Sequence, residues 1–137
     1  MPPVDGTVVI AHDGEADHEA RRSQLRLVPY MLTQRRRLRE GAPAIAGNHV
    51  VITIAPQGPY VLLAHLRRSS LCVRRGEVVV RGQPIAACGN SGNTTEPHVH
   101  VQVSNSIDWE RAEGVSIAFR DHGGGAWLPR NADIIEA

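Results

Sequence analysis

The sequence predicts a mostly β fold, with an antiparallel sandwich-like or barrel-like core and one helical insertion. Short runs rich in valine, isoleucine and leucine recur about every ten residues, with glycine- or proline-containing turns between them. Hydrophobic residues make up 42% of the 137 residues but aromatic residues only 4%, so Val, Ile, Leu and Ala must build the core. A chain of this length forms one domain, residues 1–137, with a modest core.

The expected strands follow from apolar runs that end at turn residues. The first strand ends at Asp13-Gly14, and the second and third form a hairpin around residues 56–59. Later turns contain glycine or proline, and the last run is expected at a sheet edge. The pattern predicts strands at residues 6–12, 48–55, 60–66, 78–80, 84–88, 98–104 and 115–120.

Residues 15–47 form the helical insertion, because a structureless connection of this length is uncommon in a compact domain. Between Leu25 and Leu38, apolar residues at helical spacing predict a short helix that Pro29 interrupts and that ends near Gly41. The arginines at 35–37 either contact an anionic polymer or lipid or form a solvated helix face, and the solvated face is the more common use.

Composition and charge argue against several classes of function. All 15 basic residues are arginine, yet the net charge is +1, which disfavours general nucleic-acid binding. No apolar run is long enough to span a membrane, and the first residues do not read as a secretory signal. Cys72 and Cys88 cannot form a cysteine-rich zinc site. We expect two buried free thiols, although a disulfide stays possible in an oxidising compartment.

Three histidines are the candidates for chemistry. His98 and His100 are separated by one residue, so their side chains are expected on the same face of a strand. His65 lies in the apolar run 61–66, and a Gly/Asn/Ser turn at 89–93 can bring backbone close to a ligand. One imidazole can hold a metal while its neighbour acts on a bound water, so the three histidines suggest a metal-hydrolase pocket. Taken singly, they would instead be polar strand positions and a core histidine.

Over roughly residues 4–104, the chain resembles peptidase family M23, the lysostaphin-like zinc endopeptidases that cut peptide bonds in peptidoglycan. The resemblance implies an M23-type core of duplicated hybrid motifs, zinc as cofactor, peptidoglycan peptides as substrate and a place outside the cell or in its envelope. The matching features, in chain order, are Gly47-Asn48 before a Val-x-Ile run, Ala64-His65-Leu66, Gly82-Gln83, Gly89-Asn90-Ser91-Gly92-Asn93 and Glu96-Pro97-His98-Val99-His100.

The resemblance also implies a role for each histidine. His100 would be a zinc ligand, while His98 and His65 would flank the metal-bound water and the scissile carbonyl, as general base and as stabiliser of the developing oxyanion. Zinc can lower the pKa of its bound water to about 7. Histidine is suited to transferring the proton in that range.

Two zinc ligands of the family have no counterpart here. The family takes them from a His-x-x-x-Asp motif, which lies upstream of a segment like the one that follows Met1. We therefore expect an N-terminally truncated domain that binds zinc weakly or not at all and is inactive or impaired. Candidate replacements lie in a charged loop or on a strand, where a solvated turn is the more common role: His12, Asp13, Asp17, His18 and His49.

Two further expectations follow from the missing ligand segment. An unpaired edge at residues 6–12, or at a neighbouring strand, would favour self-association. The alternative function is a non-catalytic homologue that binds cell-wall material or regulates another hydrolase, as degenerate family members do. Such a homologue would be expected to lose His65, His98 and His100 as well, and all three are present.

Overall fold

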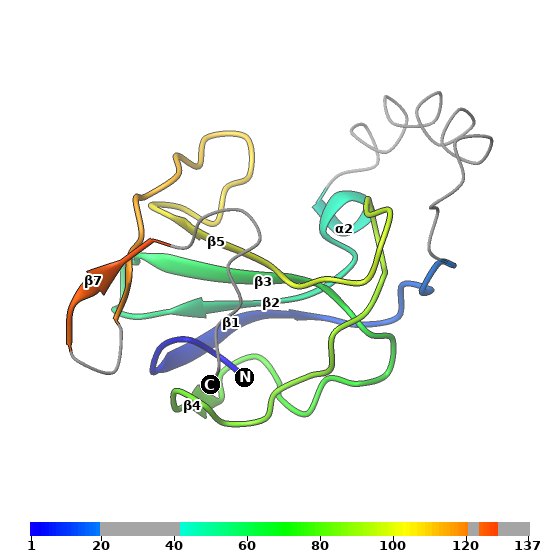
Figure 1. Ribbon diagram of the computed structural model, residues 1–137, viewed down its shortest axis with the longest axis horizontal. Helices are drawn as coiled ribbons and strands as arrows, with labels where there is room; N and C mark the ends of the chain where they lie inside the picture. The colour runs from blue at the N-terminus through cyan, green and yellow to red at the C-terminus, as the bar shows by residue number, and fades with distance from the viewer. Residues whose placement is uncertain (20–41, 121–123, 129–137) are drawn as a thin grey trace.

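The computed structural model describes residues 1–19, 42–120 and 124–128. Its centre is a five-stranded antiparallel sheet in the order β4-β1-β2-β3-β5 (Figure 1). Two short strands, β6 and β7, form a separate ribbon. The expected fold class, mostly antiparallel β with little helix, is confirmed. The bounds are β1 Gly6–His12, α2 Ala42–Ala46, β2 Asn48–Thr53, β3 Tyr60–Leu66, β4 Val78–Val79, β5 His100–Ser104, β6 Phe119–Arg120 and β7 Ala126–Trp127.

The expected strands agree with the structure most closely in the hairpin and in β1. The strands at 6–12 and 60–66 have the expected bounds, whereas β2 and β4 are shorter and β5 begins at His100 instead of residue 98. The strand expected at 84–88 was wrong. This segment makes only isolated backbone contacts, such as the bond from Cys72 N to Ile85 O at 2.8 Å. The helix expected between residues 25 and 38 lies outside the described residues.

The edges of the sheet differ in part from expectation. An unpaired edge was expected at residues 6–12 or at a neighbouring strand. β1 lies between β4 and β2, and the edge strands are β5 and β4, which is a neighbour of β1. The expected edge strand at 115–120 was wrong, because only Phe119 and Arg120 are extended there and they pair with β7 in the ribbon. Cys72 and Cys88 are free thiols, as expected, but both are exposed rather than buried.

Apolar side chains cover both faces of the sheet, as the alternation of a β-strand requires. The first face packs against the first part of the segment between β3 and β5, which is green and runs along the bottom of Figure 1. The second face carries a smaller cluster of Ala46, Val51, Leu62 and Ala64. No aromatic residue belongs to either buried cluster among the described residues. The first-face cluster consists of Val8, Val50, Ile52, Leu63, Leu66, Val73, Val79 and Ile85.

A β-bulge in β3 changes the direction of one side chain. Asn48 pairs with Leu66 and Val50 with Leu63, so Ala64 and His65 both lie opposite His49. His65 has a positive φ of 61°, a conformation that is uncommon for residues other than glycine. Regular alternation would place His65 on the same face as Leu63, but the bulge puts Leu66 there instead. The bulge therefore keeps the His65 side chain out of the first-face cluster, although the residue stays buried.

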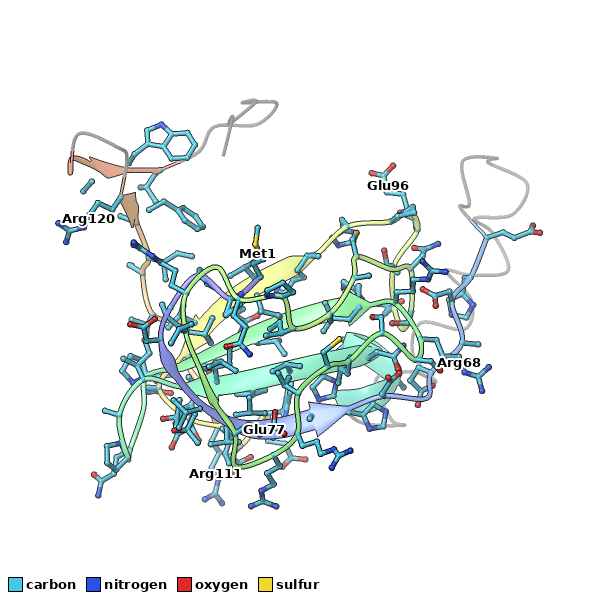
Figure 2. All side chains as sticks on the ribbon, turned by 90° about the horizontal axis from the view of Figure 1, so that it is seen from below. Met1, Arg68, Glu77, Glu96, Arg111 and Arg120 are labelled. Carbon is cyan, nitrogen blue, oxygen red and sulfur yellow. The ribbon has the colours of Figure 1, made fainter. Side chains whose placement is uncertain are left out.

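Three of the described arginines lie far apart on the surface. The labelled arginines Arg68, Arg111 and Arg120 lie on separate parts of the molecule (Figure 2). Among the residues described, no helix is both long and apolar enough to cross a membrane.

Candidate functional site

The fold brings the three candidate histidines together. The ring centroids of His65 and His98 are 4.8 Å apart, and those of His65 and His100 are 6.2 Å apart. His100 begins β5 and pairs with Ala64 of β3. His98 precedes the strand and makes an isolated bridge with Gly89, so the pair does not share one regular strand. Adjacent strands therefore assemble a site from residues that are distant in the chain.

One hydrogen bond fixes the orientation of the His65 ring. Its Nδ1–H donates to the backbone oxygen of Ser91 at 2.9 Å. Because a carbonyl only accepts, Nδ1 carries the hydrogen and Nε2 carries the lone pair. His65 is only 8% exposed. Burial lowers its pKa, the bond to Ser91 opposes this effect, and the nearby His98 and His100 lower the pKa further. The ring is therefore neutral near pH 7 and can accept a proton at Nε2.

His98 is held in the same way by its own loop. Its Nδ1–H donates to the backbone oxygen of Glu96 at 2.9 Å, and the Oγ1 atom of Thr94 lies 3.1 Å from the same nitrogen. Thr94 Oγ1 donates to Glu96 O, so it accepts from His98. Glu96 lies at an end of the molecule, in the loop before β5 (Figure 2). Like His65, His98 thus presents its Nε2 atom as a free lone pair.

His100 uses the opposite nitrogen. Its Nε2–H donates to the Oε1 atom of Gln102 at 3.2 Å, two residues along β5. The lone pair of the neutral ring is then on Nδ1. A neutral imidazole with one nitrogen in a hydrogen bond is the usual arrangement of a histidine that binds a metal. In each of the three neutral rings, one nitrogen is thus held in a hydrogen bond and the other carries a lone pair, Nδ1 in His100 and Nε2 in His65 and His98.

The described residues do not complete a metal site. Among them, no group of three or more His, Cys, Asp or Glu side chains is arranged to hold a metal ion. Catalytic zinc is normally bound by three protein ligands. Within the described residues, the expected ligand His100 is present, but a set of three zinc ligands is not.

The candidate replacements are occupied by other bonds. Asp17 accepts backbone N–H groups of Arg68 and Asn90, each at 2.8 Å, and so joins two loops. Asp13 accepts from the backbone of Gly14 and Ser69. His18 joins the same region through its backbone, whose N–H donates to Asn90 O at 3.0 Å. These residues therefore organise the loop after β1 and do not gather beside His100.

A second histidine pair lies on β1 and β2. His12 stacks on His49 with 5.3 Å between the ring centroids, and Trp109 meets His49 edge-on at 5.8 Å. His12 Nε2 lies 3.2 Å from a carboxylate oxygen of Glu15. His49 is 2% exposed and donates from Nδ1 to Gly47 O at 2.7 Å. Burial lowers its pKa, the bond to Gly47 raises it, and His12 lowers it further.

Three residues that hold the site histidines were not identified from the sequence. Ser91, Thr94 and Gln102 each fix one ring. Ser91 lies in the glycine-rich turn at residues 89–93. Only the glycines of this turn were interpreted from the sequence, so the role of Ser91 was missed. Gln102 could have been expected, because it alternates with His100 along a strand. Thr94 gives no recognisable signal, since its role depends on the conformation of the loop.

Comparison with known proteins supports one family. The model of peptidase family M23 matches residues 37–115, more than half of the chain. Peptidoglycan DD-endopeptidase ShyA of Vibrio cholerae is 40% identical over 58 residues, which are 42% of this chain and 13% of the relative. The chain thus matches only a small part of that relative's length.

One solved structure supports the fold, and a second is similar. The catalytic domain of the prophage-encoded M23 protein EnpA of Enterococcus faecalis, in a mutant form, superposes with a TM-score of 0.51 at 20% identity. The match covers 82% of this chain and 61% of that one. The catalytic domain of lysostaphin from Staphylococcus simulans matches with a TM-score of 0.48 at 23% identity, over 81% of this chain and 62% of its own. The match of the family model to more than half of the chain shows that the chain belongs to peptidase family M23.

Proposed function

We propose that this chain is the peptidase domain of a zinc-dependent endopeptidase that acts on peptide bonds in peptidoglycan. The observation that carries the proposal is the pairing of two imidazoles with fixed tautomers, His65 and His98, with 4.8 Å between their centroids in an M23 fold. The substrate class is supported by the relative ShyA, which is a peptidoglycan endopeptidase. This substrate places the working protein outside the cell or in its envelope.

The two rings can divide the work of hydrolysis. The Nε2 atom of a neutral imidazole accepts a proton from an attacking water, and the same nitrogen, once protonated, donates to a negatively charged oxygen. His65 and His98 both have Nε2 available because backbone oxygens hold their Nδ1 atoms. We assign them the roles of general base and oxyanion stabiliser.

His100 is proposed as a zinc ligand through Nδ1, the nitrogen that does not bond to Gln102. Zinc in an M23 site would supply an activated water. The described residues offer this ligand without a complete set. The test therefore adds two ligands of the family type and compares proteins with and without them.

The experiment uses the full chain with a family-type His-x-x-x-Asp segment joined before Met1. The purified protein is loaded with zinc and incubated with isolated peptidoglycan, and the release of soluble fragments is followed. We expect release that depends on zinc and on the added segment. The matched control carries alanine at both ligand positions of the added segment. An extended protein that binds one zinc per chain but releases no fragments would contradict the proposal and favour a non-catalytic cell-wall-binding role.

A further inference from the structure

We infer that the Ser91 hydroxyl is a positioning group that sets the tautomer of His65. The Ser91 residue bonds to three parts of the fold at once. Its Oγ accepts the backbone N–H of Asn48 at 2.9 Å and donates to the backbone oxygen of Leu66 at 2.7 Å. Its own carbonyl accepts the Nδ1–H of His65 at 2.9 Å. One buried serine thus joins the start of β2, the end of β3 and the ring of His65.

Burial makes these bonds strong constraints. Ser91 and Asn48 are both 0% exposed, so water cannot replace a lost partner. The Asn48 side chain adds bonds to the same network, because it donates to Leu66 O at 3.1 Å and accepts the backbone N–H of Gly14 at 2.9 Å and of Glu15 at 2.8 Å. Ser91 is therefore held in place by a buried network in which its hydroxyl and the Asn48 side chain both have hydrogen-bond partners.

The backbone around Ser91 is packed too closely to tolerate side chains. A Cβ atom on Gly47 would overlap the hydroxyl and the carbonyl of Ser91, and one on Gly92 would overlap the backbone of Gly47. Both glycines have positive φ, 63° and 74°. This contact leaves the Ser91 peptide little room to turn, and the hydroxyl bonds select the orientation in which its carbonyl faces His65.

The bulge makes such a constraint necessary. His65 has left the regular ladder at a positive φ, so β-sheet geometry alone does not orient its ring. Without an acceptor at Nδ1, the neutral ring could carry its hydrogen on Nε2, the nitrogen that faces the site. A hydrogen on Nε2 would remove the lone pair needed to accept a proton. This consequence for turnover rests on the proposed function, whereas the tautomer itself does not.

The test reads the tautomer directly in the 137-residue chain, without zinc or substrate. Nitrogen-15 NMR of the histidine rings at about pH 8, where histidine is neutral, distinguishes a protonated from an unprotonated ring nitrogen. His65→Gln identifies the signals of His65. We expect wild-type His65 to carry its hydrogen on Nδ1. In Ser91→Ala, the ratio of the Nδ1–H to the Nε2–H form should fall by about two- to tenfold, the range that one hydrogen bond allows.

A second serine in the same region provides a matched control. Ser70 Oγ also donates to a backbone oxygen, that of Arg67 at 2.7 Å, and accepts a backbone N–H, that of Ala87 at 3.1 Å. It makes no bond to a histidine. Ser70→Ala should therefore leave the tautomer ratio of His65 at its wild-type value, while unfolding measurements record any loss of stability in both variants.

Two outcomes would overturn the inference. One is an unchanged tautomer ratio in folded Ser91→Ala, and the other is an equal change in Ser70→Ala. If Ser91→Ala does not fold, Ser91→Cys keeps a weaker donor and acceptor of similar shape and should give a smaller shift in the same direction. Because zinc and peptidoglycan are absent, a failure of this test leaves the proposed function standing, and a failure to cleave peptidoglycan leaves this inference standing.

Discussion

Two pairs of histidines lie on one sheet and are built in different ways. His12 and His49 are directly paired residues of β1 and β2, beyond the β-bulge between Val8 and Ile10, and their rings stack. His65 and His98 come from a bulge and from the loop before β5. Their ring centroids are closer, 4.8 Å against 5.3 Å, although they lack a shared ladder. Regular pairing positions the first pair, whereas irregular backbone positions the second.

The hydrogen bonds of the two pairs show the same contrast. His49 donates to Gly47 and His12 contacts Glu15, so both bonds join residues within three positions of each other. The bond from His65 to Ser91 joins residues 26 positions apart. His98 is held within its own loop, by Glu96 and Thr94. Among these hydrogen bonds, only that of His65 therefore depends on a distant segment of the chain. We infer that the β1–β2 pair is structural and that the β3–β5 group is the site.

The largest effect is expected at the proposed metal ligand. In the zinc-loaded protein extended by the His-x-x-x-Asp segment, His100→Ala should remove both the bound zinc and peptidoglycan cleavage, because one of three ligands is lost. Gln102→Ala is the matched change, since it removes only the partner of Nε2 and should weaken zinc affinity by about 10- to 100-fold. Zinc content and cleavage are measured in parallel. If His100→Ala kept the zinc and His98→Ala lost it, His98 would be the ligand instead of His100.

The chain of 137 residues without the added segment should bind zinc weakly. After zinc loading and dialysis, metal analysis should find clearly less than one zinc per chain, because the described residues supply no set of three ligands. Stoichiometric zinc that survives mild chelation would contradict this expectation. In that case His12, Asp17 and His18 would again become candidates, and their alanine variants would identify the ligands.

His49, a member of the β1–β2 pair, should make the free energy of unfolding depend on pH. Burial lowers the pKa of His49 in the folded state. Between that lowered value and about 6.5, the unfolded chain binds a proton that the folded chain excludes, so the free energy of unfolding falls as the pH falls. Urea unfolding at about pH 7.5 and about pH 5.5 measures this loss, which should be smaller in His49→Gln. An identical pH dependence in the two proteins would show that another group is responsible.

The smallest effect concerns self-association through β5. The outer edge of this strand is covered near its end, where Val115 N donates to Val103 O at 2.8 Å and Ser104 bridges Gly114. Near His100 it has no neighbouring strand within the described residues. Such an edge favours pairing with another chain, so light scattering at high concentration should detect a weak dimer that Val99→Lys reduces. A monomer at every accessible concentration would contradict this.

The sequence predicted the fold where alternation and turns are regular. The β2–β3 hairpin and β1 could be placed because valine- and isoleucine-rich runs end at turn residues. Residues 84–88 show the same apolar pattern. Ile85 packs in the first-face cluster, but its segment is not paired as a strand. Burial of single side chains does not distinguish a strand from a loop that covers a sheet, and pairing partners are not encoded locally.

The sequence predicted that His65, His98 and His100 lie together, but not the geometry that brings them together. The spacing of His98 and His100 and the resemblance of the surrounding motifs indicated which histidines to choose. The bulge at His65 and the bond to Ser91 could not be predicted, because both depend on how distant segments pack. A regular β3 would have placed His65 among the core residues of the first face. The irregularity that is hardest to predict therefore positions the site.

The central claim is that the β3–β5 histidines act on substrate and the β1–β2 histidines do not. The most direct measurement is the rate of peptidoglycan cleavage by two double variants of the extended, zinc-loaded protein. The account predicts a loss of about 100-fold or more in His65→Ala with His98→Ala, with zinc retained. For His12→Ala with His49→Ala, it predicts that the cleavage rate per folded molecule changes by less than about threefold. A change of this size is expected when neither residue stabilises the transition state. Equal losses in the two variants would contradict the claim.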